Sequence, residues 1–261
     1  YSVVLDVALG DRTDAVITVG DVTVVDGDVV SLDPYTAEVE VAVELGDENA
    51  TYAVTGESGL VTGINQLVVT VTAQDGKSKA YKVTLLVILS SDTSVESISV
   101  NGDDVSDGDV YDLEAYTTDA DIAVVTTDPN ATYVKTGGSG LKTGLNDASV
   151  TVTAPDGTKQ TYSFKLNVVL SNETGIDQII VYGDPVEEGG TLELPSGTSA
   201  IGVTVITKDK YAQVEISGNE DLQAGENTVT VTVTAPDGTV EEHTFTANVA
   251  VLSGDFSIES L

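Results

Sequence analysis

Acidic side chains that could bind a metal ion recur in pairs along this chain. The pairs are Asp11 and Asp14, Asp92 and Glu96, Glu173 and Asp177, and Asp255 and Glu259, and nearby turns add Asp103, Asp107 and Asp109. Calcium, a hard cation, prefers oxygen ligands such as carboxylates. The sequence therefore offers one set of candidate calcium ligands: Asp92, Glu96, Glu173, Asp177, Asp103, Asp107 and Asp109.

A simpler interpretation of these acids stays open beside calcium binding. Aspartate is common in turns because its side chain bonds the nearby backbone, and such residues are usually solvated. The sequence has no dedicated calcium loop of the Asp-x-Asp-x-Asp-Gly type with a closing glutamate. Calcium is accordingly a candidate ligand that competes with ordinary turn formation, and no other cofactor is predicted.

Residues for catalysis are scarce. The chain has no cysteine and a single histidine, His243. A general base needs positioned partners, and serine and threonine are spread so evenly that no nucleophile–base pair can be named. Carboxylates are too abundant for any one pair to indicate a glycosidase. The sequence therefore predicts a protein that is not an enzyme, with no catalytic residues.

The elements that must position the acids repeat along the chain. Asp75-Gly76, Asp156-Gly157 and Asp237-Gly238 lie 81 residues apart, and so do Gly63-Ile64-Asn65, Gly144-Leu145-Asn146 and Gly225-Glu226-Asn227. A fixed period of this kind indicates a repeat architecture. We therefore predict repeats at residues 10–90, 91–171 and 172–252. Residues 1–9 match the last strand of a preceding repeat, and 253–261 match the first strand of a following one.

Each repeat reads as β-structure. Stretches such as Val68-Val69-Thr70-Val71-Thr72 alternate with period two, which is typical of half-buried strands. An Asp-Gly pair between two such stretches is a strong hairpin signal. In the first repeat we predict strands near 14–19, 22–25, 29–32, 38–45, 51–55, 65–73 and 79–88. Their number and spacing indicate a β-sandwich, and the short connections between repeats predict sandwiches arranged end to end.

The net charge of the chain argues against some classes of binding partner. The chain of 261 residues carries 43 acidic and 10 basic residues, a formal net charge of -33. Nucleic acids bind clustered lysine and arginine, so this balance argues against a nucleic-acid partner. Membrane insertion is not predicted because no apolar run of about 18 residues occurs. Dissolved salt or divalent cations would relieve the self-repulsion, which fits an extracellular setting.

The first repeat resembles a known family. The order Ala50-Thr51-Tyr52-Ala53-Val54-Thr55-Gly56, Leu60, Gly63-Ile64-Asn65, Val69-Thr70-Val71-Thr72-Ala73, Asp75-Gly76 and Tyr81 resembles the cadherin-like β-sandwich repeats of bacterial cell-surface proteins. The resemblance implies an immunoglobulin-like sandwich used as a spacer or adhesive repeat. The third repeat departs from the pattern at Tyr211-Ala212-Gln213-Val214 and at His243, which replaces a tyrosine, so a local specialisation is an open alternative there.

These observations predict a structural segment of a long extracellular protein on a cell surface or appendage. Such a segment would act as a stalk, spacer or filament, with an adhesive role as a further option. Its partners would be the neighbouring repeats of the same chain. An alternative is a binding module that engages cell-surface glycans, or that assembles laterally with its own copies into a sheath, layer or virion decoration. Converging exposed aromatic side chains would favour glycans, and a recurring apolar strip would favour lateral assembly.

Overall fold

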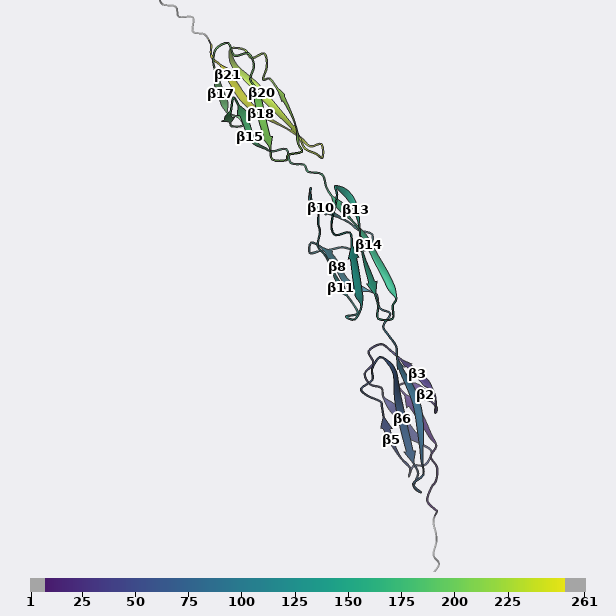
Figure 1. Ribbon diagram of the computed structural model, residues 1–261. Coiled ribbons are helices and arrows are strands. Elements are labelled where there is room, and N and C mark those ends of the chain that lie inside the picture. Colours follow the sequence, from purple (N-terminus) through teal and green to yellow (C-terminus); the bar gives the residue numbers. More distant parts are fainter. Residues whose placement is uncertain (1–7, 252–261) are drawn as a thin grey trace, which may run out of the picture. The chain divides into compact units, whose positions relative to one another are not determined.

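The structure, a computed structural model, describes residues 8–251, and every regular element in that part is a β-strand (Figure 1). No helix within residues 8–251 is long and apolar enough to cross a membrane. The terminal strands predicted within residues 1–9 and 253–261 fall outside the described part, except for Ala8 and Leu9. The prediction of an all-β fold is confirmed.

The described residues form two compact units, and the strands are described in sequence order. The first unit contains the residues up to Ser99 together with Ala123–Lys135 and Ser149–Tyr162. The second contains Val100–Ile122, Thr136–Ala148 and the residues from Ser163 onward. Within the first unit, the first seven strands are β1 (Ala15–Val19), β2 (Val22–Val24), β3 (Val29–Leu32), β4 (Val41–Leu45), β5 (Thr51–Thr55), β6 (Gly63–Thr72) and β7 (Ser78–Val87).

These seven strands form two sheets, with strand orders β2-β1-β4 and β3-β7-β6-β5. All seven strands predicted for the first repeat are present, and those at 29–32 and 51–55 have the predicted bounds. Strands β6 and β7 pair as the antiparallel hairpin that the Asp-Gly signal predicts. Strand β3 pairs parallel to β7, a feature that the sequence pattern does not reveal.

The same two sheets recur along the chain. The next strands, in orders β11-β8-β9 and β10-β14-β13-β12, are β8 (Val95–Val100), β9 (Asp103–Asp104), β10 (Val110–Leu113), β11 (Ile122–Thr126), β12 (Thr132–Thr136), β13 (Gly144–Thr153) and β14 (Lys159–Val168). The last, in orders β16-β15-β18 and β17-β21-β20-β19, are β15 (Ile176–Val181), β16 (Asp184–Val186), β17 (Thr191–Leu194), β18 (Val203–Thr207), β19 (Gln213–Ser217), β20 (Gly225–Thr234) and β21 (Val240–Val249). The prediction of tandem β-sandwich repeats is confirmed.

Alternation along the long hairpins builds each core. On β6, Leu67, Val69 and Val71 are fully buried, and on β20 so are the residues at the same phase, Val229, Val231 and Val233. Side chains from the smaller sheet cover them, such as Ile17 on β1. Because successive strand residues point to opposite faces, the threonines between these valines lie on the outer face. The cores are mainly aliphatic, and Phe164 on β14 and Phe245 on β21 are buried at the phase where β7 has Val83.

The hairpin turn differs in detail from a two-residue loop. Gly76, Gly157 and Gly238 have φ of 86°, 92° and 95°, but the preceding aspartates do not have positive φ. Gly76 N donates to Ala73 O at 3.0 Å, and Ala73 N donates to Lys77 O at 2.9 Å. The loop is therefore a turn followed by one left-handed glycine, the pattern of a longer hairpin loop.

Candidate functional site

Two tyrosine–aspartate hydrogen bonds link residues of consecutive predicted repeats. In the first unit, Tyr35 Oη donates to Asp128 Oδ1 and Oδ2 at 2.8 and 2.7 Å. In the second unit, Tyr116 Oη donates to Asp209 Oδ2 at 2.5 Å. Both tyrosines and both aspartates are offset by 81 residues, so the same contact is made twice.

A strained backbone presents each tyrosine. Tyr35 follows β3 and Tyr116 follows β10, and their φ angles are 64° and 66°. Bulky residues seldom adopt this left-handed conformation, which costs free energy. At the same phase of the third repeat stands Gly197, with φ 83° and no strain of this kind. The third repeat therefore has a residue without this strain, whereas Tyr35 and Tyr116 adopt the left-handed conformation at a conformational cost.

The acceptor aspartates are buried and fully engaged. Asp128 follows β11 and is 5% exposed, and Asp209 follows β18 and is 6% exposed. Each also closes its own turn, because Asn130 N donates to Asp128 Oδ1 at 2.8 Å and Tyr211 N donates to Asp209 Oδ1 at 2.8 Å. A buried carboxylate is stable only when it is hydrogen-bonded in this way.

The connecting segment contributes a second donor at each aspartate. A hydrogen bond from the Ser90 side chain, followed by the one from Tyr35, lowers the pKa of Asp128 below its ordinary value. Hydrogen bonds from Ser171 and then Tyr116 likewise lower the pKa of Asp209. Hydrogen bonds to the charged form favour that form, which explains the direction of both shifts. Both aspartates are therefore held ionised at neutral pH.

Backbone groups of the same serines bind the next hairpin. Asp156 N donates to Ser90 O at 3.0 Å, and Asp237 N donates to Ser171 O at 3.0 Å. Ser90 and Ser171 are 6% and 8% exposed, although each follows the last strand of its repeat. We name the set of tyrosine, aspartate and serine the junction cluster: Tyr35, Asp128 and Ser90 in one copy, and Tyr116, Asp209 and Ser171 in the other.

The predicted calcium ligands mostly accept local hydrogen bonds instead. Asp92 accepts from Ser94, Asp103 from Tyr111, Asp107 from Ser163 N, Asp109 from Ser106 N and Glu173 from Gly175 N, at distances between 2.5 and 2.8 Å. Glu96 and Asp177 are exposed strand residues. Within residues 8–251 no group of three or more His, Asp or Glu side chains is placed to hold a metal ion. These residues do not fit a calcium site as they stand, and calcium binding stays a prediction.

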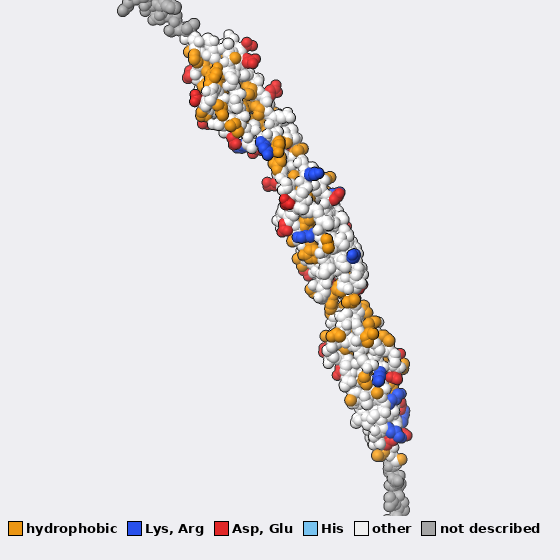
Figure 2. Space-filling view, in the orientation of Figure 1, with side chains coloured by type: hydrophobic (Ala, Val, Ile, Leu, Met, Phe, Trp, Pro, Cys, Tyr) orange, Lys and Arg blue, Asp and Glu red, His pale blue; other side chains and the backbone are white. Residues whose placement is uncertain are grey.

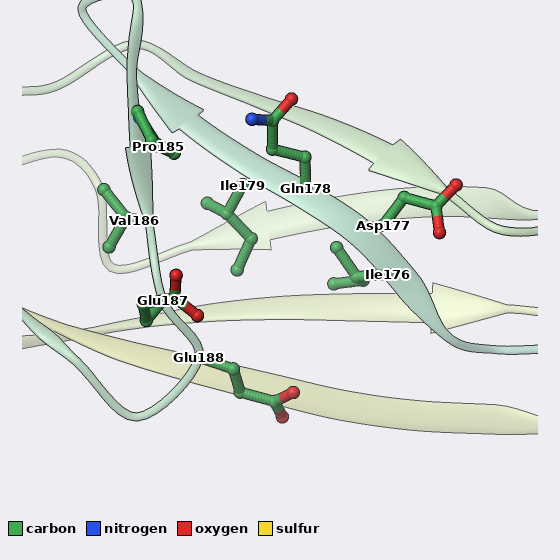
Figure 3. Close-up of a pocket in the computed structure, with 8 residues that line it drawn as sticks. All are labelled: Ile176, Asp177, Gln178, Ile179, Pro185, Val186, Glu187 and Glu188. Carbon is green, nitrogen blue, oxygen red and sulfur yellow. The ribbon is translucent and has the colours of Figure 1, made fainter.

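Asp177 lies beside a groove of about 290 Å³ between β15 and the segment after β16. Figure 3 shows Glu187 and Glu188 on that segment and Asp177 farther along β15, with Ile176 and Ile179 between the acids. Glu188 is already engaged by His243. The groove therefore does not gather its three acids around one point.

His243 replaces a tyrosine that has a structural role. Its Nε2 lies 3.1 Å from Thr174 O, and the equivalent bonds run from Tyr81 Oη to Thr13 O at 2.9 Å and from Tyr162 Oη to Thr93 O at 3.1 Å. Its Nδ1 lies 2.9 Å from Glu188 Oε1. The side chain is 5% exposed, and both ring nitrogens lie within hydrogen-bond distance of other protein atoms.

Comparisons with known proteins identify similar folds only. No family model matches the sequence, and no curated protein matches it. Among solved structures, the human desmocollin-1 ectodomain is 12% identical with a TM-score of 0.29, and the match covers 87% of this chain and 61% of that one. Repeats EC1–4 of Drosophila N-cadherin are 12% identical with a TM-score of 0.26, and the match covers 93% and 77%.

Repeats EC22–24 of mouse cadherin-23 are 12% identical with a TM-score of 0.28, and the match covers 90% of this chain and 99% of that one. Against desmocollin-1, the chain spans less than two thirds of the other protein's length. The sheet orders described above are what establish the fold. The chain is a tandem array of all-β sandwich repeats.

Proposed function

We propose that this chain is a structural segment of an extracellular cell-surface or appendage protein, acting as a stalk, spacer or filament. The observation that carries the proposal is the junction cluster, which occurs twice with the same residues. An array that transmits mechanical force needs neighbouring repeats held in a defined orientation, and in repeat proteins each repeat contacts only its neighbours. In this proposal the tyrosine hydroxyls fix each repeat to the next.

The strand spacing supports the proposed repeat boundaries of 10–90, 91–171 and 172–252. Strands β6, β13 and β20 begin at Gly63, Gly144 and Gly225, and β7, β14 and β21 begin at Ser78, Lys159 and Val240. Each series advances in steps of 81 residues. Residues 90 and 171, where we propose that the first two repeats end, are the serines of the two junction clusters, which supports a border at each proposed contact.

The negative charge of Asp128 and Asp209 strengthens the hydrogen bonds that, in this proposal, hold neighbouring repeats together. A hydrogen bond to an ionised carboxylate is roughly twice as strong as one between neutral groups. Burial of Asp128 and Asp209 shields these bonds from water and salt. The repulsion spread over a chain of net charge -33 would otherwise favour separation of neighbouring repeats. Figure 2 shows the acidic side chains scattered over the visible face without a continuous acidic patch.

Lateral assembly with other copies is the alternative, because exposed apolar side chains recur on all three repeats at Tyr52, Tyr133 and Val214 and at Leu89, Leu170 and Val251. Ile64 and Leu145 are exposed at the same phase, at 79% and 65%. In the third repeat the equivalent residue is Glu226. An apolar strip for lateral packing would have to recur on every repeat, and the position of Ile64 and Leu145 does not.

A non-catalytic role is also part of the proposal, because the buried imidazole of His243 is held by Thr174 and Glu188.

Removing both tyrosine hydroxyls tests the proposal. In the double variant Tyr35→Phe/Tyr116→Phe we expect neighbouring repeats to lose their fixed orientation, because the donors to Asp128 and Asp209 are gone. The measurement is the NMR alignment tensor fitted separately to each repeat from residual dipolar couplings. The tensors should agree in the natural chain and diverge in the variant.

The matched control is Tyr52→Phe/Tyr133→Phe. These tyrosines also lie 81 residues apart, and they are 48% and 44% exposed on β5 and β12. The control should leave the tensors unchanged. Agreement of the tensors in the Tyr35→Phe/Tyr116→Phe variant would contradict the proposed role of the junction cluster.

Calcium is tested separately by melting curves in calcium, in chelator and in sodium chloride of matched ionic strength. The local hydrogen bonds of Asp92 and its companions lead us to expect that sodium chloride reproduces the effect of calcium, since screening alone relieves the charge repulsion. A calcium-specific gain in melting temperature that disappears in Asp92→Asn would instead support the predicted calcium site.

A further inference from the structure

The second junction carries residues that the first does not need. The turn Thr127-Asp128-Pro129-Asn130 of the first junction corresponds to Lys208-Asp209-Lys210-Tyr211 in the second. Asp128 and Asp209 accept the tyrosine hydroxyl in both. The two lysines and Tyr211 therefore have no counterpart in the first cluster and are not required to form it.

These extra residues line a cavity of about 380 Å³. Its walls are Tyr116, Ser171, Glu173, Lys208, Asp209, Lys210 and Tyr211, all within the second unit. The volume is within the range of sites for small ligands. Tyr116 and Tyr211 are 50% and 59% exposed, so their rings are open to a ligand although their backbones are fixed.

The two aromatic rings are held in place before any ligand arrives. Their centroids are 5.4 Å apart and their planes are inclined by 39°. The Tyr116 hydroxyl is fixed by Asp209, and Asp209 also accepts from Tyr211 N. A ligand that stacks on these rings would pay little for ordering them, which is how a preorganised site gains affinity.

The charged side chains beside the two rings indicate which class of ligand the cavity could bind. The ammonium of Lys210 lies 4.8 Å from the centroid of the Tyr211 ring, so a cation is already present at that aromatic face. With Lys208 beside it, the cavity holds two of the ten basic residues of a chain whose net charge is -33. Asp209 and Glu173 balance the formal charge of the cavity, but Asp209 already accepts from Tyr116 and Tyr211 N. The two ammonium groups are therefore the groups that an anionic part of a ligand would contact.

We propose that this cavity binds an acidic oligosaccharide. The apolar C–H face of a sugar ring stacks on Tyr116 and Tyr211, and a carboxylate of the sugar pairs with the ammonium groups of Lys208 and Lys210. Sugar hydroxyls then donate to Glu173 and accept from a lysine. The inference adds a binding activity to the proposed structural role and does not depend on it.

The test uses trigalacturonate as the acidic probe and maltotriose as the neutral one. Binding is measured by calorimetry at low salt and by NMR shifts of the Tyr211 ring. We expect trigalacturonate to bind at one site and maltotriose to bind at least tenfold more weakly. The variants Lys208→Ala/Lys210→Ala and Tyr211→Ala should each weaken trigalacturonate binding at least tenfold without changing the melting curve, because Tyr211 is exposed and neither lysine is part of the junction cluster.

Two further variants separate the cavity from the junction cluster. Tyr116→Phe removes the bond to Asp209 but keeps the ring, so it should loosen the junction and retain most of the binding. The graft Thr127→Lys/Pro129→Lys/Asn130→Tyr should raise the stoichiometry from one site to two, because Tyr35 already supplies the other ring. Absence of binding, equal binding of both probes, unchanged binding in Lys208→Ala/Lys210→Ala, or a folded graft with one site would each overturn the proposal.

Discussion

Replacing Gly137 with alanine is expected to unfold the middle repeat or to destabilise it by about 3 kcal/mol or more, from backbone strain combined with overpacking. Gly137 has φ 83°, and a Cβ there would lie 2.0 Å from Asp147 O and 2.8 Å from Ala148 Cα. A backbone oxygen of a paired strand cannot move aside cheaply. The measurement is urea unfolding followed by repeat-specific NMR signals.

Gly140 provides the control three residues away. Its φ is 67° and nothing lies within 4 Å of a Cβ built on it. The third repeat carries Asp221 at the same phase with φ 54°, so the fold accepts a side chain at this position. Gly140→Asp should therefore have a small effect. Equal loss of stability in Gly137→Ala and Gly140→Asp would show that the close approach to Asp147 O is not what matters.

Acid is expected to open both junctions. The pKa of Asp128 and of Asp209 is lowered in the folded protein, so their contribution to stability is fully present above the ordinary aspartate pKa of about 3.9. It is lost as pH falls through the lowered folded values, because a protonated carboxyl is a poorer acceptor for Tyr35 and Tyr116. Below about pH 3.9 the alignment tensors of neighbouring repeats should begin to diverge.

The check on this titration uses the side-chain carboxyl ¹³C shifts of Asp128 and Asp209, which should report the same pH at which the tensors diverge. In Asp128→Asn, the first junction should no longer respond to acid in this range, while the second should respond as before. A transition shared by all repeats and unaffected by Asp128→Asn would mean that acid acts on the whole fold instead of at the junctions.

The strands were predictable because their signal is local. Alternation in Val68-Val69-Thr70-Val71-Thr72 and the Asp-Gly turns report directly on which side chains face a core, and the structure has the long hairpins at those positions. The parallel pairing of β3 with β7 was not predictable, since it joins segments whose register depends on the packing of the whole sandwich.

The junction cluster escaped prediction for a related reason. Tyr35 and Tyr116 recur with the period of the repeat, and so do Asp128 and Asp209. Nothing in the sequence shows that the tyrosines contact the aspartates. Their contact depends on left-handed φ angles that are unusual for tyrosine. The recurrence itself was the available signal, because exposed tyrosine in a loop has no packing reason to repeat.

The predicted calcium ligands have hydrogen bonds of their own, and some of these could be expected from the sequence. Asp92 accepts from the amide two residues ahead, at Ser94, a turn contact that the Asp-x-Ser sequence is enough to suggest. Asp109 similarly serves the turn before β10, where it accepts from Ser106 N, whereas Asp107 joins that turn to β14 by accepting from Ser163 N. These acids are close together in the sequence, but in the structure each carboxylate accepts hydrogen bonds from its own donor.

The most direct test of the account is a double-mutant cycle between Tyr35 and Asp128. Tyr35→Phe, Asp128→Ala and the combined variant are compared with the natural chain by the free energy of unfolding of the first unit. If the hydroxyl and the carboxylate hold consecutive repeats together, the two single changes will be non-additive, since removing either partner already breaks the same bond. Additive changes would show that the two residues do not act on each other and would contradict the central claim.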